Sequence, residues 1–252
     1  KWIDRATLRA YFSFVDGILV YTNYLKNNYR DSVFFKPVKA PIYVFPAGVD
    51  LSIFKPKETK SNGDDRMKIL FVGRIDPDKK IEDIIMALSD PRLRNKVELW
   101  IVGGIASKKY FEEIFSALDS LKISYKYYGF VEYKKLPTIY SSADIVVNMR
   151  PDEGFGKVFV ESMACGTPII GLRGSPGPEE IIKDGYNGYI VRDANNLTEI
   201  ILNLLENKNL LAELKTNSVK FVREYYSYET SYKIIKHIND KILKVDSDSD
   251  KV

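Results

Sequence analysis

The sequence predicts an α/β fold built around a Rossmann-like, doubly wound parallel sheet. Short β-branched runs alternate with longer amphipathic segments from residue 47 to residue 225, which is typical of a parallel sheet wrapped by helices. Strand and helix recur in a regular order over this whole stretch. With 252 residues and 45% hydrophobic residues, the chain is long enough for one or two domains with a core of their own.

The predicted strands are short apolar runs, and segments of helical periodicity lie between them. In chain order the strands are KILFVG (68–73), VELWIVGG (97–104), YKYYGFV (125–131), DIVVNM (144–149), TPIIGL (167–172) and GYIV (188–191). The first helix carries Ile81, Ile84, Ile85 and Leu88 at the spacing of one helix face. Helices are predicted at 80–90, 109–121, 134–142, 153–166 (beginning as a loop), 196–206 and 209–225.

The two ends of the chain do not follow this alternation. Residues 1–46 resemble the last β-α-β unit of a preceding α/β domain, with helical patterns at 5–14 and 23–29 and strand patterns at 16–22 and 41–46. Because the chain starts with Lys1 rather than Met, we expect that an N-terminal portion has been removed. The acid-rich DSDSD at 246–250 is predicted to be a disordered, solvated tail, since no strand precedes it.

Composition excludes several classes of function. Thirty-eight Lys and Arg against 34 Asp and Glu give a net charge of +4, too small to indicate a nucleic-acid binder, with the basic residues dispersed among acids. The single cysteine, Cys165, has no partner for an internal disulfide, and the single histidine, His237, leaves little material for a multi-His metal site or a Ser-His-Asp triad. No apolar run reaches the length of a membrane span. A reducing, cytoplasmic location is therefore expected.

The candidate site centres on EGFGKVFVESMACGTP at 153–168. Gly154 and Gly156 allow close approach of the backbone to a ligand, and the start of the following helix offers free N–H groups to an anion. Glu153 and Glu161 flank this helix start and could each accept hydrogen bonds from sugar hydroxyls. A nucleotide sugar, with hydroxyls at both ends and phosphates between, has that layout. The alternative is that Glu153 is a plain loop acid and Glu161 a solvent-exposed helix residue.

A second stretch, FVGRIDPDKKIEDI at 71–84, ends a strand and begins a helix. Gly73-Arg74 closes the strand, and Lys79 and Lys80 stand near the helix start. Arg presents a bidentate fork and Lys a point charge to phosphate, so together they suit a diphosphate. The alternative is that these residues are ordinary surface cations.

Four motifs in order and spacing carry a resemblance to a known family. GRIDPDKK, YYGFVEYKKLPTIYSSADIVV, EGFGKVFVESMACGTPII and GSPGPEEIIKDGYNGYIV resemble the C-terminal domain of the retaining glycosyltransferases of family 4, which have the GT-B fold. The resemblance implies that residues 47–225 bind a nucleotide-sugar donor and that 1–46 belong to the acceptor-side domain. It also implies that 226–252 contain a helix that crosses back to the N-terminal domain.

The resemblance assigns roles to individual residues. It implies that Arg74 and Lys79 hold the donor diphosphate and take part in catalysis with Glu153, which contacts the donor sugar, and that Glu161 binds the ribose. The remaining donor-binding positions are Gly73, the base-bordering loop Gly129-Phe130-Val131, and the helix start Gly154, Phe155, Gly156, Lys157 and Val158. No metal or other cofactor is implied. Where the family often has glycine, this sequence has Lys80, which either adds a phosphate contact or is simply tolerated.

The sequence thus predicts a hexosyltransferase that uses a UDP- or GDP-linked sugar. Its acceptor would be a glycan or a lipid-linked sugar, and the mild basic excess permits peripheral contact with the cytoplasmic face of a membrane. Two alternatives stay open. A nucleotide-sugar epimerase would convert its donor without an acceptor, and a non-catalytic nucleotide-sugar-binding protein would bind the donor without turnover.

Overall fold

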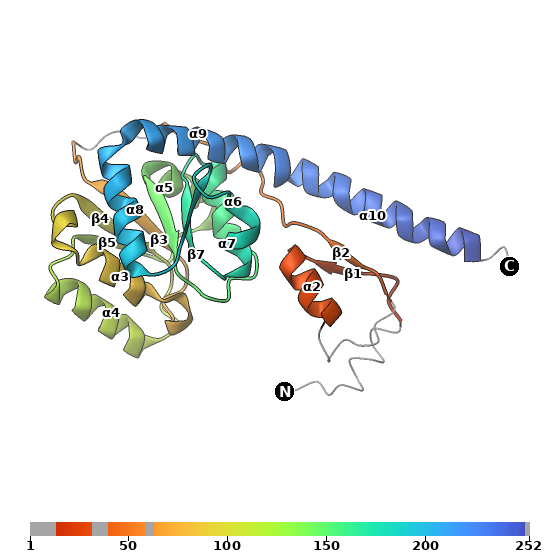
Figure 1. The fold of residues 1–252 in the computed structure, drawn as a ribbon, viewed down its shortest axis with the longest axis horizontal. Helices are drawn as coiled ribbons and strands as arrows, with labels where there is room; N and C mark the ends of the chain where they lie inside the picture. The colour runs from red at the N-terminus through yellow and green to blue at the C-terminus, as the bar shows by residue number, and fades with distance from the viewer. Residues whose placement is uncertain (1–13, 32–39, 59–62, 250–252) are drawn as a thin grey trace.

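The computed structural model describes residues 14–31, 40–58 and 63–249, and its main body is a six-stranded sheet covered by helices on both faces (Figure 1). All neighbouring strands are parallel, and their order across the sheet is β5-β4-β3-β6-β7-β8. The strands are β3 (Met67–Val72), β4 (Val97–Val102), β5 (Tyr125–Gly129), β6 (Ile145–Asn148), β7 (Ile169–Leu172) and β8 (Gly188–Val191). The predicted Rossmann-like sheet is confirmed.

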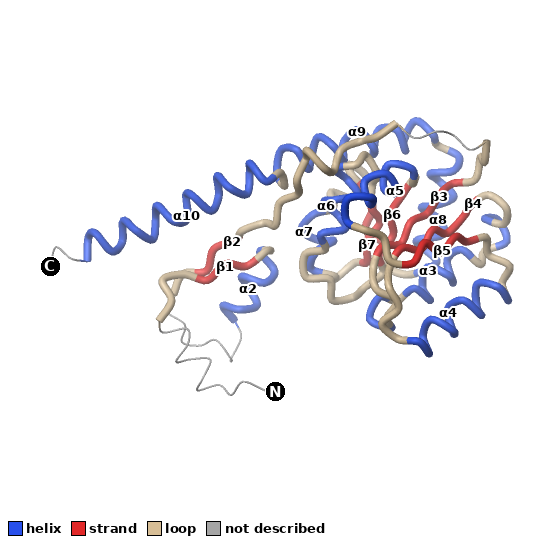
Figure 2. The backbone as a smooth tube through the Cα atoms, turned by 180° about the vertical axis from the view of Figure 1, so that it is seen from behind, coloured by secondary structure: helices blue, strands red, loops and turns tan. Residues whose placement is uncertain are grey.

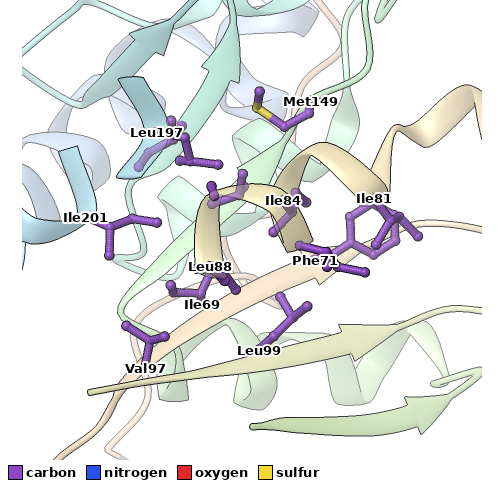
Figure 3. Packing of buried hydrophobic residues seen from close by; sticks show 14 of the residues in the cluster. Ile69, Phe71, Ile81, Ile84, Leu88, Val97, Leu99, Met149, Leu197 and Ile201 are labelled. Carbon is purple, nitrogen blue, oxygen red and sulfur yellow. The ribbon is translucent and has the colours of Figure 1, made fainter. Parts of the chain in front are cut away.

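Two apolar clusters, one on each face, hold the sheet between its helices. On one face, α3 (Ile81–Leu88), α4 (Lys108–Ser120) and α8 (Ala194–Glu206) pack on β3 and β4 through residues such as Ile69, Ile84 and Leu197 (Figure 3). On the other face lie α5 (Leu136–Ser142), α6 (Lys157–Ala164) and the end of α9 (Lys208–Tyr225). Strands buried on both faces are expected to read as continuous apolar runs, which is how the sequence presents them.

One helix of this domain was not predicted from the sequence. Helix α7 (Pro176–Ile181) begins with Pro-Gly-Pro, a run that indicates a turn. Proline is nevertheless compatible with the first turn of a helix, where its missing N–H has no intrahelical partner. The short 3-10 helices η1 (Pro77–Lys79) and η2 (Pro91–Leu93) were likewise not predicted, whereas η3 (Tyr133–Lys135) forms the start of the helix predicted at 134–142.

A small β-α-β unit precedes the connector to the main sheet. Strands β1 (Ile18–Val20) and β2 (Ile42–Val44) are parallel, with α2 (Asn23–Asp31) between them. The strand and helix patterns predicted at 16–22, 23–29 and 41–46 are therefore present. The helix predicted at 5–14 lies, except for Phe14, outside the described residues.

The chain ends in a long helix that runs from the main sheet along the β1–β2 pair. Figure 2 shows α10 (Tyr228–Ser249) beside these two strands. The Ser231 hydroxyl donates to the Pro46 carbonyl at 2.9 Å, which ties the start of α10 to the connector. The predicted disordered tail at 246–250 is corrected as far as Ser249, because α10 continues to that residue. Once a helix is nucleated, each added residue gains a backbone hydrogen bond, and this allows the polar residues that follow to continue α10.

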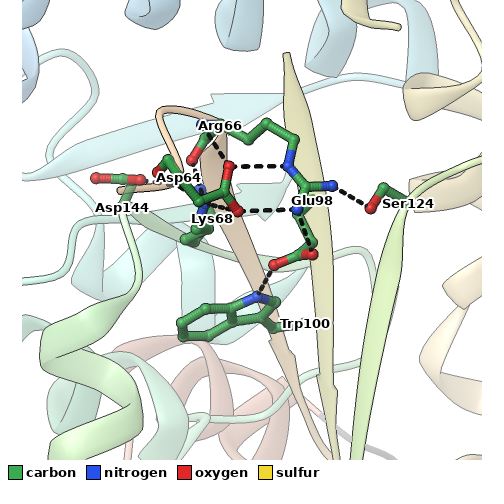
Figure 4. Close-up of polar contacts among 7 residues, drawn as sticks. All are labelled: Asp64, Arg66, Lys68, Glu98, Trp100, Ser124 and Asp144. Carbon is green, nitrogen blue, oxygen red and sulfur yellow. Dashed lines mark hydrogen bonds and ion pairs between the residues drawn. The ribbon is translucent and has the colours of Figure 1, made fainter. Parts of the chain in front are cut away.

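A polar network closes the amino edge of the sheet, away from the edge where the candidate site lies (Figure 4). Arg66 pairs with Asp64 at 2.8 Å and with Glu98 at 2.9 Å, and also donates to the Ser124 hydroxyl. The Arg66 guanidinium holds the pKa of Asp64 well below its usual range. Since the partners precede or begin β3, β4 and β5, the network ties the starts of three strands together.

Among the described helices, none combines the length and the apolar character that crossing a membrane requires.

Candidate active site at the switch point of the sheet

The sheet order brings two loops together at its carboxyl edge. The chain runs from β3 outward to β4 and β5, then returns to the other side of β3 for β6, β7 and β8. The order reverses between β3 and β6, and doubly wound sheets bind ligands in the crevice outside the strand ends at such a point. Loops 73–80 and 149–156 follow these two strands, so the two predicted site stretches lie together at this edge, joined by the Lys79–Glu153 and Asp78–Arg150 ion pairs.

Glu153 lies between two cations, one from each loop. Its Oε2 is 3.7 Å from Lys79 Nζ and 3.6 Å from Arg150 Nη1. The side chains of Lys79 and Glu153 are only 13% and 15% exposed. Both distances exceed hydrogen-bond range, and within the described part of the chain the Glu153 carboxylate accepts no hydrogen bond. A half-buried carboxylate fixed by charge alone is free to accept a hydrogen bond from a ligand hydroxyl.

The backbone of Glu153 is held from the opposite side by α7 and the residue before it. Its N–H donates to the Ser175 hydroxyl at 3.0 Å, and its carbonyl accepts from Gly177 N–H at 2.6 Å. Gly177 permits this approach because a Cβ there would stand 2.6 Å from the Phe155 carbonyl oxygen. Helix α7 thus sets the position of the Glu153 loop.

The start of α6 offers unsatisfied donors beside Glu153. Its N-cap, Gly156, has a positive φ of 76° and provides no side-chain cap. Among the described residues, the backbone N–H groups of 154–158 find no acceptor. Free N–H groups and the positive end of the helix dipole favour an anion here. Phe155 is buried against Tyr226 at a ring distance of 5.9 Å, whereas Lys157 is exposed.

Glu161 lies in the second turn of α6 and is buried, with 6% of its surface exposed. The alternative of a solvent-exposed helix residue is therefore wrong. Burial raises the pKa of the Glu161 carboxyl, opposed by a hydrogen bond from Tyr140, by the Lys157 charge and by Tyr133. The Tyr140 hydroxyl donates to Oε2 at 3.1 Å. A buried carboxylate with this partial compensation is costly and calls for a further donor.

The other predicted residues take up the rim of the crevice. Arg74 is exposed, and its side chain has no partner among the residues described. Gly73 directly follows β3, and its N–H donates to the Val102 carbonyl at 2.9 Å; a Cβ built on it would lie 3.8 Å from Lys79 Cε. Gly129 is the last residue of β5, the neighbour of β4, and has a positive φ of 65°. After it, the Phe130 side chain is 81% exposed and Val131 half-buried.

Lys80 does not join this group. Its ammonium pairs with Glu82 at 3.4 Å and is 44% exposed, and the extra phosphate contact stays a prediction. Its backbone instead explains the glycine expected at this position, because φ is 53° and ψ 44°. That left-handed conformation is easy for glycine and costs other residues about 1–2 kcal/mol.

Lys80→Gly is therefore expected to stabilise the protein, by about 1 kcal/mol or a rise in Tm of about 2–4 °C. Thermal unfolding followed by circular dichroism measures the change. Lys220→Gly, at an exposed position in the interior of the ordinary helix α9, is the matched control and should lower Tm, because glycine weakens a helix interior by about 1 kcal/mol. A fall in Tm for Lys80→Gly would show that the backbone at this position is not strained.

Four residues of this site were not predicted from the sequence. Asp78 and Arg150 pair across the crevice at 3.2 Å, and Ser175 and Gly177 hold the Glu153 backbone. The motif GSPGPEE is part of the family resemblance, but the resemblance assigns no role in the site to its residues. The residues around Arg150 do not indicate its role, since its partner Asp78 is far away in the sequence.

The remaining reactive side chains, Cys165 and His237, take no part in the ion pairs described above. Burial raises the pKa of the Cys165 thiol to about 12, and the residue is 2% exposed, as expected of a small buried hydrophobe. His237 is exposed on α10. In residues 14–31, 40–58 and 63–249, no three His, Cys, Asp or Glu side chains gather as metal ligands.

Comparison with known families decides between the classes of protein that use such a crevice. Residues 53–221 match the family described as glycosyl transferases group 1. The chain belongs to this family. The matched region of this group 1 chain begins in the connector and contains the whole six-stranded sheet and both loops of the crevice.

Relatives of the group 1 chain extend over most of its length. It is 30% identical to a "Probable sucrose-phosphate synthase" of Thermosipho melanesiensis over 223 residues, covering 86% of this chain and 51% of that protein. It is 29% identical to a "D-inositol 3-phosphate glycosyltransferase" of Geodermatophilus obscurus, and the match covers 67% of this chain and 41% of that protein. The chain thus spans about half the length of these curated relatives.

Solved structures share its fold. A glycosyltransferase from Rickettsia africae gives a TM-score of 0.82 at 18% identity, covering 97% of this chain and 69% of that one. The crystal structure of Anabaena Alr3699/HepE in complex with UDP and glucose gives a TM-score of 0.76 at 19% identity. The match covers 96% of this chain and 68% of that one. The predicted fold, the Rossmann-like half of the GT-B architecture, is confirmed.

Proposed function

We propose that this chain forms the donor-binding half of a glycosyltransferase that moves a hexosyl group from a UDP- or GDP-linked sugar to an acceptor hydroxyl. The observation that carries the proposal is the crevice between β3 and β6. It combines the uncapped start of α6, the cations Arg74 and Lys79, and two carboxylates, Glu153 and Glu161. The donors suit a diphosphate, and the carboxylates suit hydroxyls at its two ends.

The proposed reaction proceeds with retention of configuration and without a protein nucleophile or a metal. The bond between the anomeric carbon and the diphosphate oxygen breaks, and its electron pair stays on the diphosphate. The acceptor oxygen bonds to the same face of that carbon, and its proton passes to the departing diphosphate. Arg74, Lys79 and the α6 N-terminus stabilise the developing charge, so catalysis is positioning plus electrostatic support.

The names of the relatives support this proposal. A sucrose-phosphate synthase, an inositol phosphate glycosyltransferase and a structure that holds UDP and glucose share the family or the fold. We extend the proposal to a glycan or lipid-linked acceptor, to acceptor recognition by an N-terminal domain that includes residues 1–46, and to a cytoplasmic location at the membrane face.

Binding of nucleotides tests the proposal. UDP, GDP, ADP and their hexose conjugates are titrated by calorimetry and by thermal shift, because a ligand of the native state raises its stability by mass action. One diphosphate should bind, and Glu161→Gln should weaken it at least tenfold, roughly the loss of one charge-assisted hydrogen bond. Glu206→Gln, on the exposed side of α8, is the control and should bind normally.

The outcomes separate the proposal from its alternatives. Release of the nucleotide together with a glycosylated acceptor identifies a transferase. Conversion of the donor sugar without any acceptor would identify an epimerase. Binding without turnover would favour a non-catalytic protein, and no binding by any of the six compounds would reject the nucleotide-sugar site.

A further inference from the structure

Arg150 links the two loops of the crevice. Its Nη2 is 3.2 Å from Asp78 Oδ2 in the loop after β3, and its Nη1 is 3.6 Å from Glu153 Oε2 in its own loop. Its backbone is fixed too, because its N–H donates at 2.9 Å to the side chain of Asn148, which is 5% exposed. The side chain is 29% exposed. Arg150 is therefore held on three sides at the switch point of the sheet.

Asp78 depends on this arginine. Its Oδ1 is buried and has no hydrogen-bond partner among the described residues. Within the same residues its charge is balanced by Arg150 at 3.2 Å and by Lys79 at 4.0 Å. Lys79 also faces Glu153 at 3.7 Å. Without Arg150, two carboxylates would share one ammonium at the place where a diphosphate would bind, and like charges there repel an anion.

We propose that Arg150 is a positioning residue that neutralises Asp78 and orients Glu153, so that the crevice admits a nucleoside diphosphate. This inference rests on the proposed function of the same site. Arg150 acts through the two carboxylates that it touches, which leaves Lys79 and Arg74 available for the phosphates. The guanidinium suits this task better than an ammonium, since its planar fork reaches two acceptors at once.

A charge-rescue experiment tests the inference. Dissociation constants for UDP, GDP and ADP are measured by calorimetry on the wild type, R150A, D78N and the double variant R150A/D78N. R150A should weaken the diphosphate that the wild type binds by about tenfold, on the scale of a lost charge pair. D78N in the R150A background should return the constant to within about threefold of the wild type, because it removes the unbalanced carboxylate. R150K should fall between R150A and the wild type.

Rescue distinguishes this role from a merely structural one. If Arg150 only supports the loop, the double variant will bind as weakly as R150A or worse, and the inference is overturned. Equal binding by R150A and the wild type would overturn it as well, while leaving the proposed function intact. If the wild type binds neither these three nucleotides nor their hexose conjugates, the proposed function fails and the inference fails with it. Thermal unfolding of each variant shows that it is folded, and R150K keeps the test decisive should R150A not fold.

Discussion

Glu153→Gln is expected to lower the rate of sugar transfer by about 10²–10³-fold while nucleoside diphosphate binding is kept. Glutamine preserves the volume of the side chain but removes the charge that Lys79 and Arg150 hold at 3.7 and 3.6 Å. The donor sugar would lose a preorganised charged partner, and the removal of one preorganised electrostatic group typically costs that much in rate. The diphosphate would lose a nearby negative charge, so its affinity should stay equal or increase. Steady-state release of nucleotide and calorimetry measure the two quantities.

Glu113→Gln, on α4 and 57% exposed, is the matched control, and its rate should equal that of the wild type. Equal loss of transfer and of diphosphate binding in Glu153→Gln would mean that the residue shapes the crevice rather than meeting the sugar. An unchanged rate would remove Glu153 from the mechanism.

Gly177→Ala is expected to lower transfer by about two orders of magnitude without unfolding the protein. A Cβ at this position would stand 2.6 Å from the Phe155 carbonyl oxygen and 2.9 Å from that of Glu153. Because both contacts are with backbone, the loop that carries Glu153 must move. A displacement of about 1 Å in a reacting geometry costs about a hundredfold in rate, whereas overpacking costs about 1–3 kcal/mol of stability.

Gly104→Ala is the control for this substitution, since a Cβ there meets no atom within 4 Å. It should leave both the rate and Tm close to those of the wild type. A Gly177→Ala variant with full activity would show that the Glu153 loop is set by other contacts.

The sequence was sufficient to predict those parts of the structure that depend on the pattern of neighbouring residues. Each strand of the main sheet is a short apolar run, and the structure places it within two residues of its predicted bounds. The glycine loop before α6 also carries its own signal, since Gly156 takes the positive φ that glycine favours. From these two facts the sequence could place Glu153 and Glu161 on either side of a helix start.

Other parts of the site depend on contacts between distant segments. The Asp78–Arg150 pair exists only because β3 and β6 are neighbours in the sheet, and no pattern within either loop indicates it. Helix α7 was missed because prolines and a glycine dominate its first turn, although its packing on Glu153 is what requires Gly177. The hydrogen bond that Glu161 accepts could not be predicted either, since its donor Tyr140 lies on another helix.

A crystal structure of the protein with its bound nucleotide sugar tests the central claim most directly. The account predicts the diphosphate between Arg74, Lys79 and the start of α6, a ribose hydroxyl on Glu161, and a sugar hydroxyl on Glu153. A donor bound elsewhere on the sheet edge, with Glu153 and Glu161 both free of ligand, would contradict it.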